Sequence, residues 1–240
     1  ATSEIYTLSL HDALPISLKP DLVLASRDEN SFSLVSALQR GGVLVWTVTP
    51  HTVRETIQML WRMVGIFRSE EAAQRVRLLE EALERCEWTA ADIEPWQYFC
   101  PIWQDEFSGR PWWMTFNQDT YCNDLLRLFG GQNVFAQRQR HYPLQADLGL
   151  GEEEEAGERD VRYPRVGREE VLRADPQVIL LPSEPFAFAE PHRQQIEKSL
   201  ARTRAVRQGR IHFVDGSLLT WSGTRLGQAL MLLPEMLGLV

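Results

Sequence analysis

The sequence predicts an α/β protein in which two lobes of parallel-type sheet, flanked by helices, are joined by a long spine helix. Short apolar stretches typical of buried strands alternate with amphipathic stretches typical of helices in both halves of the 240-residue chain. This alternation is the pattern of parallel strands connected by crossover helices. One long helical stretch lies between the halves. We therefore expect a first lobe over residues 18–66, the spine over 67–94 and a second lobe over 95–240.

The first lobe is predicted from a β-α-β-α pattern. Residues 18–25 form a nearly continuous apolar run, which suits a strand covered on both faces. Residues 30–39 place apolar side chains at helical spacing and end at a double glycine, a common helix terminator. A second buried strand is expected over residues 43–48, followed by a helix that starts at His51 or Thr52.

The spine helix has a clear beginning and a strong helical composition. Ser69 is the expected N-cap, and acidic residues follow it in the first turn. The run to about Cys86 is rich in Ala, Leu, Glu, Arg and Gln, which are strong helix formers. At ~1.5 Å per residue, about 20 residues reach roughly 30 Å. From the residues alone, an ordinary surface helix of a single domain is the alternative. A rigid spine predicts only a small hinge motion on ligand binding.

The second lobe repeats the strand and helix alternation with two irregular segments. Residues 103–114 are expected to form a loop, and the acidic residues 144–160 an exposed, mobile insertion, since runs of like charge are not buried. The regular elements are expected as strands over 96–102, 177–181 and 210–214, and as helices over 119–129, 168–174, 190–199 and 225–237.

Composition excludes several function classes. The net charge of −8 argues against nucleic acid as a main partner, and no apolar run approaches the ~20 residues that would insert in a membrane. Cys86, Cys100 and Cys122 form neither a zinc pattern nor a disulfide framework, so we expect three buried or half-buried thiols. No catalytic motif occurs and the histidines do not cluster, so we predict neither an enzyme nor a resident cofactor. His141 and His192, expected in loops, are weaker candidates for contact with a metal complex.

Aromatic residues follow the predicted strands. The chain has eight tryptophans, several of them in segments expected as loops. Ligands of open α/β sheets bind at the carboxyl ends of the strands. The segments there, 26–30, 103–114, 183–186 and 219–223, would together offer an aromatic floor that suits a large planar chelate. We expect one indole of the Trp112-Trp113 pair to pack in the core instead.

Three sequence pieces occur in a characteristic order. The first piece, residues 119–135, contains a helix that ends at a double glycine. The second, residues 163–172, is a Tyr-Pro turn that leads into an acidic helix, and the third, residues 175–181, is a buried strand that starts at Asp-Pro. In this order they resemble the C-terminal lobe of class III periplasmic substrate-binding proteins, which deliver cobalamin, ferric siderophores or haem to ABC importers. Residues 183–186 with 221–226 are similar to the helical-backbone metal receptor subgroup.

The resemblance, which runs from about Leu18 to Val240, implies a site and a partner. Its implied ligand is a metal-containing chelate, a corrinoid first and a ferric siderophore or haem second, held in the cleft between lobes. It implies that Glu169 docks onto membrane subunits of the importer, and that the natural protein is periplasmic or attached to the cell envelope. The implied ligand contacts are Arg27, Trp112, Trp113, Tyr163, Glu184 and Trp221.

The beginning of the chain departs from this pattern. Residues 1–17 resemble a translated sequencing adapter, although a short native strand and loop is the alternative. The family's N-terminal lobe begins with a β-α-β unit that has no counterpart before Leu18. We therefore expect an incomplete first lobe, weak ligand binding and an open sheet edge.

Two other function classes stay open. A metal-cluster or small-molecule enzyme scaffold of related two-lobed build would need its cysteines at one site, whereas Cys86, Cys100 and Cys122 fall on predicted helix or strand positions. An interaction module without a ligand would lack a concave aromatic surface.

Overall fold

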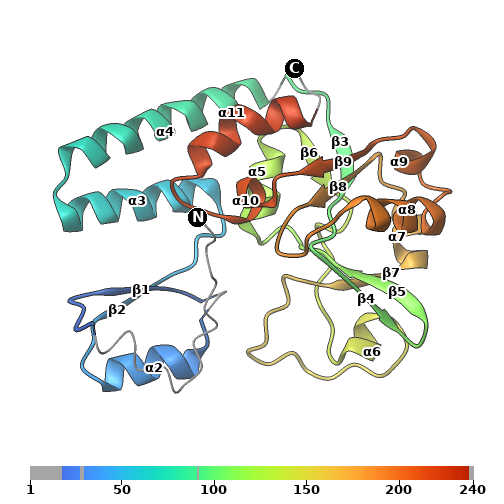
Figure 1. The fold of residues 1–240 in the computed structure, drawn as a ribbon, viewed down its shortest axis with the longest axis horizontal. Helices are drawn as coiled ribbons and strands as arrows, with labels where there is room; N and C mark the ends of the chain where they lie inside the picture. The colour runs from blue at the N-terminus through green and yellow to red at the C-terminus, as the bar shows by residue number, and fades with distance from the viewer. Residues whose placement is uncertain (1–17, 28–29, 91, 238–240) are drawn as a thin grey trace. The chain divides into compact units, whose positions relative to one another are not determined.

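The computed structural model describes residues 18–27, 30–90 and 92–237, and divides the chain into two compact units between Pro50 and His51. It is a mixed α/β structure with parallel sheets flanked by helices, as predicted (Figure 1). The predicted adapter segment lies outside the described residues. The three-part division into first lobe, spine and second lobe stays a prediction.

The first unit is a β-α-β motif. Strand β1 (Val23–Ser26) and strand β2 (Val45–Val48) pair in parallel, with Val23 opposite Val45. Helix α2 (Phe32–Arg40) connects them, and the Ser31 hydroxyl accepts a hydrogen bond from the Leu34 N–H at 3.3 Å. The two strands and the helix confirm the predicted order.

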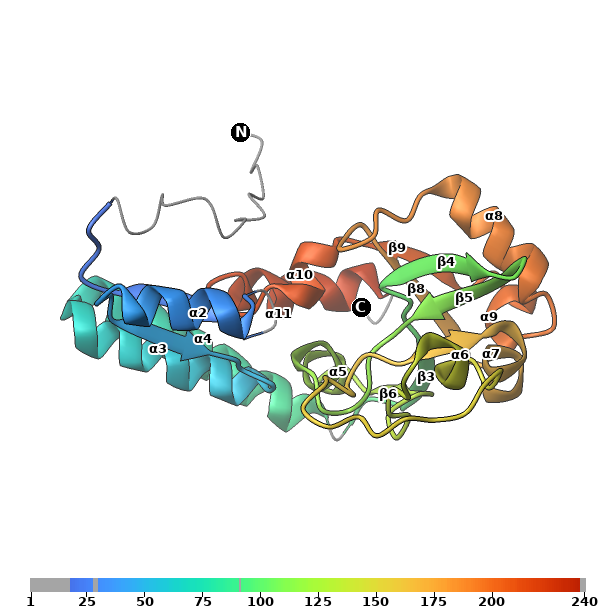
Figure 2. The ribbon, with the colours of Figure 1, turned by 90° about the horizontal axis from the view of Figure 1, so that it is seen from below.

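The second unit begins with a pair of long helices, α3 (Val53–Phe67) and α4 (Glu70–Ala90). A capping box of Thr52 and Glu55 starts α3, and the Ser69 hydroxyl accepts the Ala72 N–H at 3.1 Å to start α4. Helix α11 (Leu226–Met236) packs along α4 (Figures 1 and 2). The predicted long helix is therefore confirmed, and it has helical neighbours on two sides.

A four-stranded parallel sheet forms the centre of this unit, in the order β6-β3-β8-β9. Alternate residues of its strands point to opposite faces. Tyr98 and Leu180 join one apolar cluster, while Phe99, Ile179 and Leu181 join a second one. The strands are β6 (Gly131–Asn133), β3 (Trp96–Phe99), β8 (Val178–Pro182) and β9 (Ile211–Val214). Both faces are buried, which explains why these strands read as apolar runs.

Short helices follow most strands of the central sheet. Helix α5 ends at Arg127, and a turn leads from it to the predicted double glycine, where Gly130 has a φ of +76° that residues other than glycine rarely adopt. The boundaries of α7 and α8 match those predicted from the sequence. The helices are α5 (Tyr121–Arg127), α6 (Leu144–Asp147), α7 (Arg168–Ala174), α8 (Glu190–Ser199), α9 (Arg204–Arg207) and α10 (Gly216–Thr220).

The loop predicted over residues 103–114 is wrong. Strands β4 (Trp103–Phe107) and β5 (Arg110–Met114) form a hairpin, and β5 pairs on its other side with β7 (Arg165–Gly167) in an antiparallel sheet. Acidic and amide residues in β4 concealed the strand, because such residues are rare in strands. Ser108 and Gly109 make the turn with positive φ values.

Two further expectations need correction. The segment 144–160 is not exposed at its start, because Ala146 and Asp147 lie in α6 and are buried. The imidazole of His192 lies in the first turn of α8, where its Nδ1 accepts the Ala189 N–H at 3.0 Å, so this residue is not in a loop. The expectation of buried or half-buried thiols is confirmed: all three cysteines are free, and none is exposed. In the described parts of the chain, every helix is too short or too polar to cross a bilayer.

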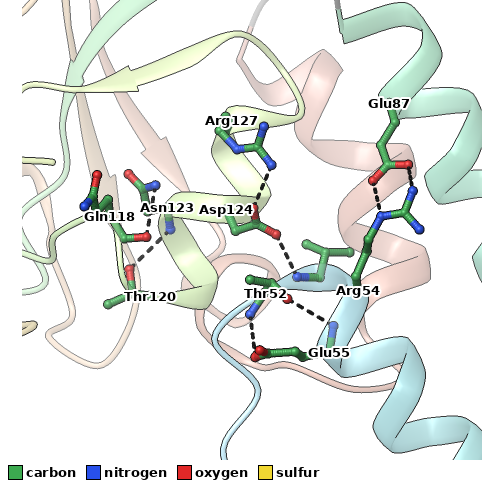
Figure 3. Close-up of polar contacts among 10 residues, drawn as sticks. Thr52, Arg54, Glu55, Glu87, Gln118, Thr120, Asn123, Asp124 and Arg127 are labelled. Carbon is green, nitrogen blue, oxygen red and sulfur yellow. Dashed lines mark hydrogen bonds and ion pairs between the residues drawn. The ribbon is translucent and has the colours of Figure 1, made fainter.

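One carboxylate ties the long helices to the central sheet's helix α5. Asp124 accepts the Val53 N–H at 2.8 Å, at the N-terminus of α3, and forms a 2.9 Å ion pair with Arg127 (Figure 3). Arg54 at the same end of α3 donates to Glu87 of α4. A carboxylate at a helix N-terminus satisfies a free N–H and interacts favourably with the helix dipole.

We predict that Asp124→Ala lowers the free energy of unfolding by about 1–2 kcal/mol, because α3 loses an ionised acceptor at its N-terminus. Asp124→Asn retains an acceptor and should lose roughly half as much. Urea denaturation followed by circular dichroism measures both. Asp119→Ala, which removes an exposed carboxylate nearby, is the control. A loss for Asp124→Ala no larger than for the control would contradict the assigned anchor.

Candidate binding surface at the carboxyl edge of the sheet

Strands β8 and β9 end side by side, and the loops that leave them are locked together. Pro182 lies opposite Val214 in the parallel register. The Ser183 N–H donates to the Val214 carbonyl oxygen at 3.0 Å, and the Gly216 N–H donates to the Ser183 hydroxyl at 3.0 Å. The chain after β8 is therefore held against the start of α10.

Gly216 allows Glu184 to take its position. A Cβ placed on Gly216 would lie 2.4 Å from the Glu184 carbonyl oxygen and 2.6 Å from its nitrogen. Backbone atoms cannot yield easily at such distances. The Glu184-Pro185 bond is cis. Only glycine therefore lets the loop after β8 lie directly on α10.

An aromatic cluster continues from this loop to the antiparallel sheet. The Phe186 ring meets Trp103 of β4 edge to face, with centroids 5.4 Å apart. On its other side Phe186 contacts Phe188 at 4.8 Å and His192 at 5.0 Å. Edge-to-face contacts of this kind are favourable beyond the area they bury. Trp103 is 42% exposed, so part of its indole is open to solvent.

An arginine and a tryptophan follow α10. Arg225 donates to the Ser217 hydroxyl of α10 and lies over the Trp221 ring, with its guanidinium carbon 5.4 Å from the ring centroid. Trp221 is 45% exposed. The guanidinium is thus positioned beside an open aromatic face. We call Trp103, Glu184, Phe186, Trp221 and Arg225 the carboxyl-edge residues.

Tyr163 lies next to a small polar cluster. Arg162 lies over the Tyr163 ring at 5.4 Å, donates to His51 Nε2 at 3.0 Å and pairs with Asp160 at 2.6 Å. Since arginine only donates, His51 Nε2 is the acceptor. Burial alone would raise the pKa of Asp160, but the hydrogen bonds from Arg162 and the charge of that guanidinium hold it below its ordinary value.

The other predicted site residues are distributed differently. Trp112 and Trp113 are 7% and 2% exposed, so both indoles are buried where one was expected to be. Arg27 is exposed after β1 in the first unit. Glu169 is exposed in the first turn of α7, where it pairs with Arg168 and, at 4.0 Å, with Arg202. The ligand contacts of Arg27, Trp112 and Trp113 stay predictions, as does the docking role of Glu169.

Three carboxyl-edge residues, Trp103, Phe186 and Arg225, are absent from the set of ligand contacts predicted from the sequence. Trp103 and Phe186 lie in the predicted segments 103–114 and 183–186, but only the structure shows that their rings meet. Arg225 stands next to the predicted Trp221 motif, yet only the structure shows its contact with the ring. Among the described residues, no group of three or more His, Cys, Asp or Glu side chains could hold a metal ion.

No family model and no curated protein match the chain. The periplasmic vitamin B12 binding protein BtuF of Vibrio cholerae matches with a TM-score of 0.69 at 20% identity, over 94% of this chain and 76% of that one. The periplasmic haem-binding protein RhuT from Roseiflexus matches at 0.68 and 19%, over 93% and 77%. The chain has the fold of the class III periplasmic binding proteins.

A third structure extends the comparison to iron. A possible iron-binding periplasmic solute-binding protein from Staphylococcus epidermidis matches this class III fold with a TM-score of 0.65 at 18% identity, over 92% of this chain and 78% of that one. The predicted two-lobed α/β build is therefore confirmed by likeness to solved structures.

We predict that Gly216→Ala displaces the Glu184 loop and lowers stability by about 1–3 kcal/mol, because the new methyl group meets backbone atoms. Gly65→Ala is the matched control. A Cβ on Gly65 meets nothing within 4 Å, and the residue lies inside α3. It should gain up to about 1 kcal/mol from helix propensity. Thermal denaturation of both variants compares them, and equal effects would refute the close packing.

We predict a pH-dependent cost for Asp160→Asn. The pKa of Asp160 is lower in the folded protein, so its contribution is present above the unfolded value of about 3.9 and is lost as pH falls through the folded value. The side chain is 38% exposed, which limits the cost to about 1 kcal/mol or less. Urea titrations should show the difference from wild type at pH 7 shrinking below about pH 4. Asp119→Asn serves as control, and a difference that stays constant would contradict the lowered pKa.

Proposed function

We propose that this protein is the substrate-binding component of an ABC importer and captures a metal-containing chelate. The observation that carries this proposal is the exposed Trp221 with Arg225 beside it, at the carboxyl edge of the sheet. The solved proteins of the same fold include binders of vitamin B12 and haem. A corrinoid is the first candidate, and a ferric siderophore or haem the second.

The carboxyl-edge residues suit a large planar ligand with acidic groups. Indole rings offer flat apolar faces with little conformational freedom to lose. A guanidinium binds carboxylate or phosphate oxygens in a bidentate manner. Trp221 and Trp103 would contact the ring system of the chelate, and Arg225 its anionic substituents. Capture by these contacts is non-covalent and needs no catalytic group.

Delivery requires a contact with the membrane subunits of the importer. Glu169 is the candidate, because its carboxylate is exposed and its present partners, Arg168 and Arg202, are themselves largely open to solvent. Surface ion pairs of this kind contribute little to stability and exchange readily. An arginine of the importer could therefore replace them. The proposal places the natural protein in the periplasm or at the cell envelope.

Titration of tryptophan fluorescence with cyanocobalamin, haem and a panel of ferric siderophores tests the proposal. We predict saturable quenching by one of these ligands, after correction for ligand absorbance. Trp221→Ala should weaken its binding at least about tenfold, equivalent to about 1.4 kcal/mol. Trp88→Ala is the matched control, since Trp88 is 85% exposed on α4.

The two tryptophan variants also define the result that would contradict the proposed chelate binding. Equal weakening in Trp221→Ala and Trp88→Ala would show that the quenching reports surface adsorption of an apolar chelate. Absence of saturable binding by every ligand in the panel would refute the chelate-binding function and leave only the fold.

A further inference from the structure

An open cavity of about 600 Å³ lies in the second unit, between strands β5 and β7 and helices α6 and α7. Pro111, Trp112, Ala146 and Leu148 supply apolar walls, while arginines and carboxylates supply the rest. Small-molecule sites typically have about 300–1,000 Å³, apolar walls and a few placed polar groups. The carboxyl-edge residues do not line this cavity.

Trp112 forms part of the cavity wall and carries an unused hydrogen-bond donor. Neighbouring residues of a strand point to opposite faces, so Trp113 packs into the core against Phe99 while Trp112 faces the cavity. Trp112 is 7% exposed, and its Nε1–H has no acceptor among the residues that the structure describes. The residue opposite it in β7 is Gly167, where an added Cβ would meet nothing within 4 Å. Space therefore lies open beside the indole.

A buried polar network fixes one wall of the cavity. Asp147 is 1% exposed and accepts the backbone N–H groups of His141 at 2.9 Å and Arg165 at 2.7 Å. Arg138 pairs with Asp147 at 3.0 Å and with Glu170 at 2.9 Å. A buried carboxylate with this many donors is fully engaged. These groups hold the wall in place and have little capacity left for a ligand.

Two other cavity arginines are not engaged. Arg110 begins β5 and Arg173 lies in the last turn of α7, and both line the cavity. Neither guanidinium has a hydrogen-bond or ion-pair partner in the described part of the chain. The cavity lining holds four arginines against three carboxylates, in a protein of net charge −8. An excess of donors and positive charge is therefore concentrated here.

We propose that this cavity is a second binding site, which takes a small organic carboxylate. Arg110 and Arg173 hold the acid group, since guanidinium and carboxylate match in charge and geometry. The apolar body of the ligand lies against Trp112, Pro111 and Leu148, and a ligand oxygen gives the Trp112 Nε1–H the acceptor that it lacks. Inorganic phosphate alone would leave these apolar walls uncovered. The site goes beyond the proposed chelate-binding function and does not depend on it.

Saturation-transfer NMR on the whole chain tests this site with benzoate, 2-naphthoate and hexanoate as probes. Benzamide, which has the same body as benzoate without its charge, and inorganic phosphate are the comparison probes. We expect the carboxylates to bind saturably, with benzamide and phosphate at least tenfold weaker. The double variant Arg110→Gln with Arg173→Gln should weaken binding of the carboxylates at least tenfold. Benzamide binding as well as benzoate, or no carboxylate binding at all, would overturn the proposal.

Two controls separate this site from general charge effects and from the chelate site. Arg77→Gln with Arg207→Gln removes the same charge from exposed positions outside the cavity and should bind the probes as wild type does. Trp221→Ala should also bind them unchanged. Trp112→Phe retains a ring but loses the N–H, and should weaken binding several-fold while the circular dichroism spectrum stays native. If the control pair of arginines weakens binding as much as Arg110 and Arg173 do, the site is wrong.

Discussion

The parallel pairing of β3, β8 and β9 is the constraint on which the rest of the second unit depends. Leu180 is buried in one apolar cluster and Ile179 in the other, so a slip of one residue would exchange the two sets of side chains. With the register held by burial on both faces, each loop leaves the sheet at the same edge. This is why Ser183 and Gly216, 33 residues apart, form a hydrogen bond. The exposed aromatic side chains that follow are presented by a rigid base, which suits a receptor whose ligand is bound without chemistry.

The antiparallel sheet adds a second requirement, because its polar residues must be satisfied where they are buried. Asp147 is the deepest carboxylate of this region, and its position is tolerable only because Arg138 and two backbone N–H groups converge on it. The same contacts hold α6 against β7 and so shape the cavity wall. Charge is thus used here in two ways. Groups such as Asp147 and Arg138 position the backbone, whereas the guanidinium groups of Arg110 and Arg173 have no partner among the described residues.

The central sheet could be predicted from the sequence, because strands buried on both faces read as apolar runs. The long helix α4 could be predicted because it begins at the capping residue Ser69. The turn at the double glycine after α5 could be predicted as well, because glycine adopts the positive φ that such a turn requires. Strand β4 could not be predicted, since its acidic residues are stable in a strand only through pairing with β5, a contact that local propensity does not encode. The burial of Asp147 likewise depends on tertiary contacts, with Arg138 and Arg165, that the local sequence does not encode.

For the candidate site, the aromatic and glycine positions were visible in the sequence, but the contact of Arg225 with Trp221 required the fold.

The adjacent residues Trp112 and Trp113 show how one strand links these two regions. Trp113 meets Phe99 edge to face at 6.1 Å and so anchors the antiparallel sheet to the core of the parallel one. Trp112, turned to the other face by the period of the strand, lines the cavity. Large aromatics after a strand suggested a single ligand-binding floor, yet burial removes both indoles from the exposed surface. The open aromatic faces belong instead to Trp103, at the start of β4, and to Trp221, which follows α10. The exposure of each indole, rather than the aromatic content of the segment, therefore decides which tryptophans can meet a large ligand.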